Sequence, residues 1–266
     1  MNLEVGNTNS SGNPPPGIAV VKIGGSTLGS QDTTLHDLAI LREKGHIPVV
    51  VHGGGKTISD WLERQGTNAQ FIRGLRVTDN NSLEVVLAVL AGLINKTLVS
   101  SLISLGVKAI GISGIDGSSV EAKVENPELG FVGQVTQVNP ELLQSLIESG
   151  FTPVVAPVSI RNVNEMTTEN KILNINADAV AGEIAVALNA ERLIFLTDVE
   201  GVLDSSQSLI KTLSADDAQH LITSGTAGGG MIPKLEACIR ALSTVSKAYI
   251  VDGRQERALI NAIDNN

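Results

Sequence analysis

The chain has 266 residues, 27 of them glycine, a formal net charge of -9, and as aromatic residues only one Trp, one Tyr and four Phe. Apolar residues make up 42% and charged residues 18% of the chain, a balance that excludes an intrinsically disordered protein. A single cysteine excludes a disulfide framework and a cysteine-based zinc site, and the acidic balance argues against a nucleic-acid partner. About 70–75% of the unfolded surface is buried at this length, which suffices for one large α/β domain or two lobes.

The first segment differs from the rest of the chain. Residues 1–17 are polar and rich in Gly, Pro, Asn and Ser, and they predict a disordered N-terminal tail. They lack the basic start and the apolar stretch of a signal peptide. The longest apolar run, at 83–94, contains Glu84 and is too short to span a membrane. We therefore expect a cytoplasmic protein without membrane contact.

Beyond the tail, short β-branched runs alternate with helical stretches. We expect strands over residues 18–23, 47–51, 107–113, 120–124, 131–138, 152–158, 192–198 and 248–252. We expect helices over residues 32–44, 57–65, 80–105, 140–149, 177–189, 214–224 and 233–243, with a further helix at the end. Continuous apolar strands separated by helices predict a three-layer αβα sandwich around a mostly parallel sheet. Ligands bind such sheets at the carboxyl ends of the strands.

Glycine-rich segments follow the first two expected strands, with Gly24 and Gly25 after the first and residues 53–55 after the second. The segment HGGGKT resembles the end of a P-loop, but that motif requires glycine at position 50, where the chain has Val50. What remains is a strand, three glycines and a helix start. This pattern suits backbone N–H groups that approach an anion, and it equally suits a tight turn.

Two lysines stand in positions that are unfavourable for a cation. Lys22 lies at the end of an apolar strand, where it needs an anionic partner or must reach solvent. Lys234 follows Pro233 in the first turn of a helix, where the helix dipole disfavours positive charge. An anion held between the preceding glycines and Lys234 would remove this conflict. The penalty is only about 0.3–1 kcal/mol, so a tolerated exposed lysine is the alternative.

Polar residues gather in NINAD, at 174–178, which opens a helix. Asn176 is a candidate helix cap and Asp178 complements the helix dipole, while Asn174 adds a further hydrogen-bonding group. Arg76 in GLRVTD, expected in a loop before a helix, suits bidentate carboxylate recognition, although a lone loop arginine is commonly only solvated.

The histidines and the cysteine carry less information. The four histidines are scattered and show no metal-ligand spacing, so we expect no protein metal site. His52 borders the triple glycine, where we expect a structural residue that forms hydrogen bonds. Cys238 lies on the apolar face of an expected helix and is assigned to the core.

Taken in chain order, eight segments together resemble the N-acetylglutamate kinases of the amino acid kinase superfamily over about residues 18–254. They are VVKIGGS, VVVHGGGK, GLRVTD, GISGIDG, LGFVGQV, NINADAVAGEIA, LTDVEGVLD and GGMIPK. The ordered set is specific, although each segment alone is weak. The resemblance implies ATP-dependent phosphorylation, with Mg²⁺, of the side-chain carboxylate of N-acetyl-L-glutamate in the second step of arginine biosynthesis.

The resemblance also implies roles for individual residues. Lys22 and Lys234 stabilise the transferring phosphoryl group, and Asp178 holds both lysines rather than acting as a base. The substrate site comprises Gly54, Gly55, Arg76 at the α-carboxylate, Asn174 at the acetamido end, and Asn176, with Gly24 and Gly25 close to the phosphates. The residues implied for the nucleotide are Asp198, Val199, Gly201, Val202, Leu203, Thr226, Ala227 and Gly228. These residue types fit the implied reaction. A carboxylate nucleophile is already ionised and needs no general base, so the site needs cations and backbone N–H groups rather than a catalytic histidine or cysteine.

The same resemblance gives an expected organisation. Residues 18–173 form an N-lobe for the amino-acid substrate and dimerisation, and residues 174–266 form a C-lobe for ATP. Arginine-inhibited members carry an extra N-terminal helix that residues 1–17 do not resemble, so we expect a homodimer without strong arginine feedback. Ser26 and Lys56 depart from the residues common in the family at these positions.

Two alternatives remain open. An aminoadipate-type relative acts on a substrate carried by an acidic protein, which calls for a basic surface; the net charge of -9 and the GLRVTD and NINAD segments argue against it. A catalytically silent member would only bind a ligand or a partner protein, and the presence of Lys22, Asp178 and Lys234 together argues against that.

Overall fold

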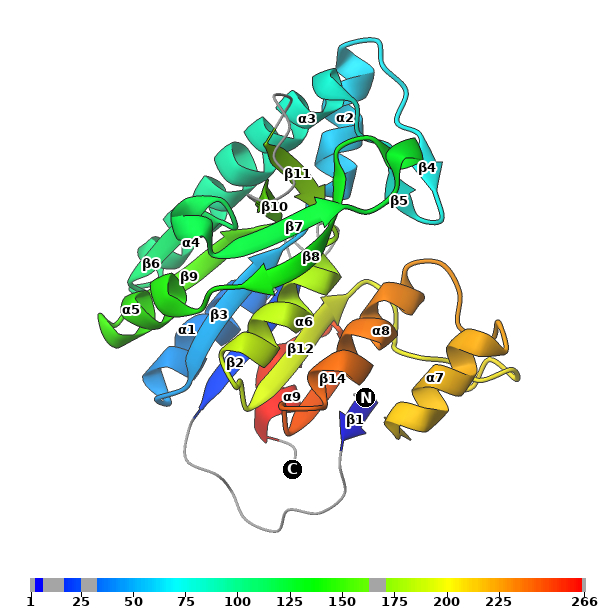
Figure 1. Ribbon diagram of the computed structural model, residues 1–266. Helices are drawn as coiled ribbons and strands as arrows, with labels where there is room; N and C mark the ends of the chain where they lie inside the picture. Colours follow the sequence, from blue (N-terminus) through cyan, green and yellow to red (C-terminus); the bar gives the residue numbers. More distant parts are fainter. Residues whose placement is uncertain (1–2, 7–16, 25–32, 163–170, 265–266) are drawn as a thin grey trace.

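The computed structural model describes residues 3–6, 17–24, 33–162 and 171–264. At its centre lies an eight-stranded sheet in the order β13-β1-β14-β12-β2-β3-β9-β6, and the six strands from β14 to β6 are parallel (Figure 1). The strands are β1 (Leu3–Gly6), β2 (Ile18–Ile23), β3 (Ile47–His52), β6 (Ala109–Ser113), β9 (Thr152–Ala156), β12 (Arg192–Thr197), β13 (Thr212–Leu213) and β14 (Lys247–Asp252).

Both faces of this sheet are buried because successive apolar side chains point to opposite sides. Val20 belongs to a core cluster shared with one helical layer, and its neighbour Val21 belongs to a cluster shared with the other. The first layer contains α5 (Glu141–Glu148), α6 (Ala177–Ala187), α7 (Ala215–Thr223) and α8 (Met231–Ala241). The second contains α1 (Thr34–Glu43), α4 (Asn95–Ser104) and α9 (Ala258–Asp264). The predicted three-layer αβα sandwich is therefore confirmed.

A small barrel stands beside the sheet and adds walls near the carboxyl ends of its strands (Figure 1). It consists of β7 (Val120–Val124), β8 (Val132–Val138), β10 (Val158–Arg161) and β11 (Ile172–Ile175). The predicted hairpin of β7 and β8 is confirmed. The single strand predicted over 152–158 is instead two strands, β9 and β10, separated by Pro157, which has no N–H to continue a ladder.

Other short elements lie around the barrel. α2 (Gly55–Arg64) follows β3 directly, and β4 (Phe71–Ile72) pairs with β5 (Leu75–Arg76) as a short hairpin. Two 3-10 turns, η2 (Asp116–Ser118) and η3 (Pro127–Leu129), flank β7. Arg76 was predicted in a loop, and the structure places it in β5 instead. Two residues are too few for a strand period to show in a sequence.

One long helix runs from Asn80 to Ser104, as predicted for residues 80–105. It is made of α3 (Asn80–Leu87), a π segment η1 (Ala88–Ile94) and α4. The length argument from the apolar run at 83–94 was incomplete, because this helix of 25 residues is long and apolar enough to cross a membrane by length and composition. Within the described ranges, no other helix is both long and apolar enough to do so. Such a helix also occurs in the core of soluble proteins, and here α4 packs on β6 and β9.

The N-terminal segment also departs from the prediction. Residues 3–6 lie within the tail predicted as disordered, yet they form β1, antiparallel to β14 and parallel to β13. An open strand edge presents backbone N–H and C=O groups that a short segment can pair with. The sequence of the segment itself does not show that such an edge is available. Residues 1–2 and 7–16 of the predicted tail lie outside the described residues.

Candidate active site

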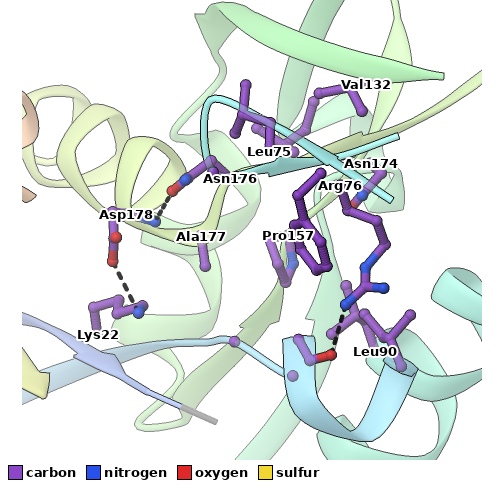
Figure 2. A pocket seen from close by; sticks show the side chains of 17 residues that line it. Lys22, Leu75, Arg76, Leu90, Val132, Pro157, Asn174, Asn176, Ala177 and Asp178 are labelled. Atoms are coloured by element: carbon purple, nitrogen blue, oxygen red, sulfur yellow. Dashed lines mark hydrogen bonds and ion pairs between the residues drawn. The ribbon is translucent and has the colours of Figure 1, made fainter. Parts of the chain in front are cut away.

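A pocket of about 210 Å³ opens at the carboxyl ends of β2 and β3, where the parallel sheet meets the barrel (Figure 2). Its floor is formed by Lys22, the glycines 53–55 and the start of α6. The barrel, the β4–β5 hairpin, α2 and η1 supply the remaining walls. The sequence predicted most of the polar lining, which comprises Lys22, Gly54, Gly55, Arg76, Asn174, Asn176 and Asp178.

Two lysines from distant parts of the chain meet one carboxylate beside this pocket. Lys22 Nζ lies 2.8 Å from Asp178 Oδ1, and Lys234 Nζ lies 3.1 Å from Asp178 Oδ2. The exposed fractions of the three side chains are 9%, 13% and 7% for Lys22, Lys234 and Asp178. Both lysines are thus held by a buried anion, which rules out the alternatives of a solvated Lys22 and an exposed Lys234.

Asp178 is positioned by its helix and by its charge partners. Asn176 stands before α6 in an extended conformation, and its Oδ1 accepts the N–H of Asp178 at 2.7 Å, so Asn176 caps the helix as predicted. Burial alone would raise the pKa of Asp178, but the charges and hydrogen bonds of Lys22 and Lys234 more than offset it and hold the pKa below 3.8. The carboxylate is therefore ionised at pH 7, as an anchor for two cations must be.

The glycine turn after β3 is shaped by its neighbours. Gly53 donates its N–H to the carbonyl of Ile23 at 2.9 Å, which ties the turn to the end of β2. A Cβ on Gly54 would meet the terminal carbons of Leu90 and Ile94, so a larger residue here would force these side chains to shift. On the neighbouring turn, Gly24 donates to the carbonyl of Leu196 at 3.2 Å. Gly25, Ser26 and Thr27 lie outside the described residues.

Arg76 is a buried cation with donor capacity left over. Its Nη2 donates to the carbonyl of Gly55 at 2.7 Å and to Ser59 Oγ at 2.8 Å, and the guanidinium lies 4.7 Å from the centre of the Phe71 ring. Burial lowers the pKa of Arg76. Its Nη1 is buried without a hydrogen-bond partner among the described residues, a costly state that an anionic ligand in the pocket would relieve.

The hydrogen bonds around Asn174 fix the orientation of its amide. Thr78 Oγ1 donates to the carbonyl of Arg76 at 2.9 Å, and Asn174 Nδ2 lies 3.1 Å from the same hydroxyl. A hydroxyl has one proton, so Thr78 accepts from Asn174. The amide nitrogen of Asn174 therefore faces Thr78. Its Oδ1 lies on the other side of the amide and is placed to accept from a ligand in the pocket.

The residues expected at the nucleotide form a separate group at the carboxyl end of β12 and before α8. Asp198, Val199, Thr226 and Gly228 are exposed, whereas Val202 and Ala227 are buried in the core cluster. Gly201 has a φ of 143°, which favours glycine, and Leu203 forms a β-bridge with Leu209. None of these residues lines the pocket of about 210 Å³.

Sequence reasoning missed the apolar walls and the supporting polar residues. The walls include Phe71, Leu75, Leu90, Val132 and Pro157, and the supports include Ser59, Thr78 and Asn95. Each of these eight residues comes from a different element or connection, and no local pattern joins them. His52 is fully buried and hydrogen-bonded, which confirms the prediction of a structural residue. Cys238 is fully buried, as predicted for a core residue, and burial raises the pKa of its thiol.

A second pocket of about 880 Å³ adjoins the first and shares Gly74, Leu75 and Asn176 with it. It lies between the β7–β8 hairpin and the helices α6 and α8. Its charged lining is mixed, with Glu125, Glu183 and Glu236 facing Arg73 and Arg240. The second pocket therefore has three acidic and two basic side chains, whereas the first has Lys22 and Arg76 with Asp178 as its acidic residue.

The fold and the site together define an α/β protein with Lys22 and Arg76 in one pocket at the carboxyl edge of a parallel sheet, an arrangement suited to anionic ligands. Residues 17–252 match the amino acid kinase family, and the chain belongs to that family. An acetylglutamate kinase of Dehalococcoides mccartyi (strain CBDB1) is 47% identical over 92% of this chain and 90% of its own length. An acetylglutamate kinase of Gloeobacter violaceus is 46% identical over 91% of this chain and 82% of its own length. A solved structure from Streptococcus mutans UA159 is similar with a TM-score of 0.79 at 30% identity, covering 88% of this chain and 94% of that one.

Proposed function

We propose that this protein transfers the γ-phosphoryl group of ATP to the side-chain carboxylate of N-acetyl-L-glutamate, as in the second step of arginine biosynthesis. The observation that carries the proposal is the pair of cationic centres in one pocket. The unsatisfied Nη1 of Arg76 suits one carboxylate of the substrate, and Lys22 stands where the other would meet a phosphoryl group. The names of the similar proteins support the same substrate.

The chemistry needs alignment and charge neutralisation rather than a base. An oxygen of the substrate carboxylate, already ionised at pH 7, attacks the γ-phosphorus. The bond from that phosphorus to the bridging oxygen breaks, ADP leaves with the electron pair, and an acyl phosphate forms. Lys22 and Lys234 neutralise the charge on the transferring group, and Asp178 keeps both ammonium groups in place.

The substrate is assigned by matching each of its polar groups to one protein group. Its α-carboxylate pairs with Arg76, and its acetamido N–H is accepted by Asn174 Oδ1. Gly54 and Gly55 line the part of the pocket assigned to the substrate side chain. Asn176, which caps α6, lines the same pocket. The apolar walls around them favour an acetyl group over a free ammonium, because burying an unpaired ammonium is costly.

We assign ATP to the half of the chain after residue 174 and the amino-acid substrate to residues 18–173. The nucleotide then lies on Asp198 to Leu203 and on Thr226 to Gly228, with Gly24 and Gly25 near its phosphates. The described residues contain no cluster of three or more His, Cys, Asp or Glu that could hold a metal ion. Asp178 carries the one carboxylate among the described residues that line the pocket, and it is already paired with two lysines. Mg²⁺ is therefore expected to arrive on the phosphates of ATP.

We also propose a cytoplasmic homodimer that is not strongly inhibited by arginine and has no nucleic-acid or membrane partner. The acidic net charge of -9 supports the absence of a nucleic-acid partner. Light scattering of the full chain tests the dimer, and a hexamer contradicts it. Inhibition by low millimolar arginine contradicts the absence of feedback.

The deciding experiment is a hydroxylamine trap for the acyl phosphate, run with ATP, Mg²⁺ and N-acetyl-L-glutamate. Wild type should give the hydroxamate, and Lys234→Ala should reduce it strongly. Lys108→Ala is the matched control, because Lys108 is exposed next to the amino end of β6, at the opposite edge of the sheet. No hydroxamate from wild type contradicts the proposed function, and unchanged activity in Lys234→Ala contradicts only the role of Lys234. A carrier-bound aminoadipate substrate, run in parallel, tests the alternative kinase.

A further inference from the structure

His52 is a buried histidine whose two ring nitrogens are both engaged. It ends β3 and is 0% exposed. Its Nδ1 lies 3.0 Å from the carbonyl oxygen of Gly53, and its Nε2 lies 3.3 Å from Nδ2 of Asn95. Burial first, and the charge of Lys22 as well, lower the pKa of His52 to about 4. The ring is therefore neutral at pH 7 and carries a single proton.

The carbonyl of Gly53 can only accept, so Nδ1 of His52 carries that proton, and Asn95 lies against the other ring nitrogen. Asn95 is also fully buried, and its Nδ2 lies 2.9 Å from the carbonyl oxygen of Val154 and 3.3 Å from that of Ile112. Both carbonyls can only accept, so the amide nitrogen faces them, and Oδ1 accepts from Lys96 Nζ at 3.1 Å. The two N–H groups of Asn95 therefore serve three acceptors, the two carbonyls and Nε2 of His52. Because Nδ1 donates to Gly53, Nε2 carries no proton, and its lone pair faces the amide nitrogen of Asn95.

The surrounding backbone leaves room for this contact. Gly111 on β6 faces Asn95, and a Cβ there would collide with Asn95 Oδ1. The π segment η1 ends immediately before Asn95, and its Leu90 and Ile94 are the side chains that face Gly54. The same stretch of helix therefore contacts both His52 and the glycine turn. π segments are frequent at functional sites.

We propose that Asn95 and His52 form a positioning relay that aims the N–H of Gly54 into the pocket, toward the transferring phosphoryl group. The peptide between Gly53 and Gly54 is trans, so its N–H points opposite to its C=O. His52 holds the C=O on the buried side. Gly54 lines the pocket and directly precedes α2, where the N–H groups have no helical acceptor. A donor fixed in advance stabilises charge that develops in the transition state.

This inference rests on the proposed function, and two substitutions that differ by one methylene test it. In His52→Asn the amide nitrogen reaches the position of Nδ1 and still donates to Gly53. In His52→Gln the amide reaches the position of Nε2 and leaves Gly53 without a donor. We expect kcat of His52→Asn within about threefold of wild type. We expect kcat of His52→Gln to fall roughly tenfold to a hundredfold, with both KM values changed less than about threefold, because a misdirected donor acts on the transition state.

Thermal unfolding of both variants separates positioning from packing. A merely structural histidine lowers Tm and kcat alike in the two variants, and that result overturns the relay. His36→Gln serves as the matched control, because His36 is exposed on α1. Its kcat should equal that of wild type.

A readout that needs no activity comes from ¹⁵N NMR of the wild-type histidines at pH 7. The relay requires protonated Nδ1 and unprotonated Nε2 in His52, and Asn95→Leu should shift the Nε2 signal toward that of a free acceptor. The opposite tautomer, or a charged ring, overturns the relay even if neither His52 variant folds. If wild type forms no acyl phosphate from N-acetyl-L-glutamate, the proposed function fails, while the tautomer still decides the relay.

Discussion

Asp178 on α6 and Lys22 on β2 form an ion pair of 2.8 Å that joins the first strand of the parallel sheet to a helix 156 positions later in the sequence. The second oxygen of Asp178 binds Lys234 of α8 at 3.1 Å. One carboxylate thus sets the separation of two ammonium groups that would otherwise repel each other. Both the stability of this edge of the sheet and the proposed chemistry depend on it.

Replacing Asp178 by Asn should therefore damage folding and activity together. The substitution leaves two buried lysines without a counter-ion, which should lower the free energy of unfolding by about 3–5 kcal/mol. It should also lower kcat by a hundredfold or more, since the lysines lose their positions. Urea unfolding and the hydroxamate assay measure these effects. Asp60→Asn is the control, because Asp60 is partly exposed and pairs with the exposed Lys56. An Asp178→Asn protein of wild-type stability contradicts the prediction.

The same ion pairs predict the pH dependence of stability. The folded pKa of Asp178 lies below 3.8, so its contribution is complete above the unfolded pKa and is lost as the pH falls through the folded pKa. Between about pH 5 and pH 2 the free energy of unfolding of wild type should fall more steeply than that of Asp178→Asn. Other carboxylates with lowered pKa values, such as Asp252, affect both proteins equally. Parallel curves from urea unfolding at each pH would contradict the assignment.

Arg76 should govern the affinity for the acyl substrate and leave that for ATP unchanged. In Arg76→Lys the contacts with Gly55 and Ser59 cannot both be kept alongside a contact with the substrate carboxylate. Because hydrogen bonds to charged groups contribute about 1.5–3 kcal/mol, KM for N-acetyl-L-glutamate should rise roughly tenfold to a hundredfold. Arg64→Lys, at the exposed end of α2, is the matched control. A rise confined to KM for ATP would place Arg76 in the wrong subsite.

Thr78 should act on the same subsite through Asn174. Thr78→Val keeps the shape of the side chain and removes the hydroxyl that accepts from Asn174 and donates to the carbonyl of Arg76. KM for N-acetyl-L-glutamate should rise about threefold to tenfold, the equivalent of one neutral hydrogen bond. Thr78→Ser keeps the hydroxyl and should retain the wild-type KM. Equal KM values in both variants would show that Asn174 is held by other contacts.

The sequence points to the two lysines of this site because each violates a local preference, whereas the roles of the other polar residues follow from the resemblance to a family. Lys22 at the end of a buried strand and Lys234 at a helix start both need an anion, and the structure supplies Asp178 to both. The order of strands and helices is likewise readable, because both faces of the sheet are covered and the apolar runs are continuous.

The parts that the sequence did not predict depend on contacts between distant segments. β1 forms because it pairs with β14 and β13, and LEVG alone is too short to show a period. β10 pairs with β11 and β7 in the barrel, and Asn95 meets His52 across 43 positions of the sequence. Each of these features is fixed by packing that has no counterpart in local spacing.

The packing of η1 on the glycine turn can be measured directly through Gly54. A Cβ at this position would meet Ile94 Cδ1 and Leu90 Cδ2, so Gly54→Ala should cost about 1–3 kcal/mol of unfolding free energy. Ile94→Val removes one of the two obstructing atoms. It should therefore destabilise the Gly54→Ala protein less than it destabilises wild type, with a coupling energy of about 0.5 kcal/mol or more by urea unfolding. Gly92→Ala is the control, because a Cβ there meets nothing within 4 Å, and its effect should add to that of Ile94→Val. Additive effects of Gly54→Ala and Ile94→Val would mean that the turn moves away from η1 instead of pressing against it.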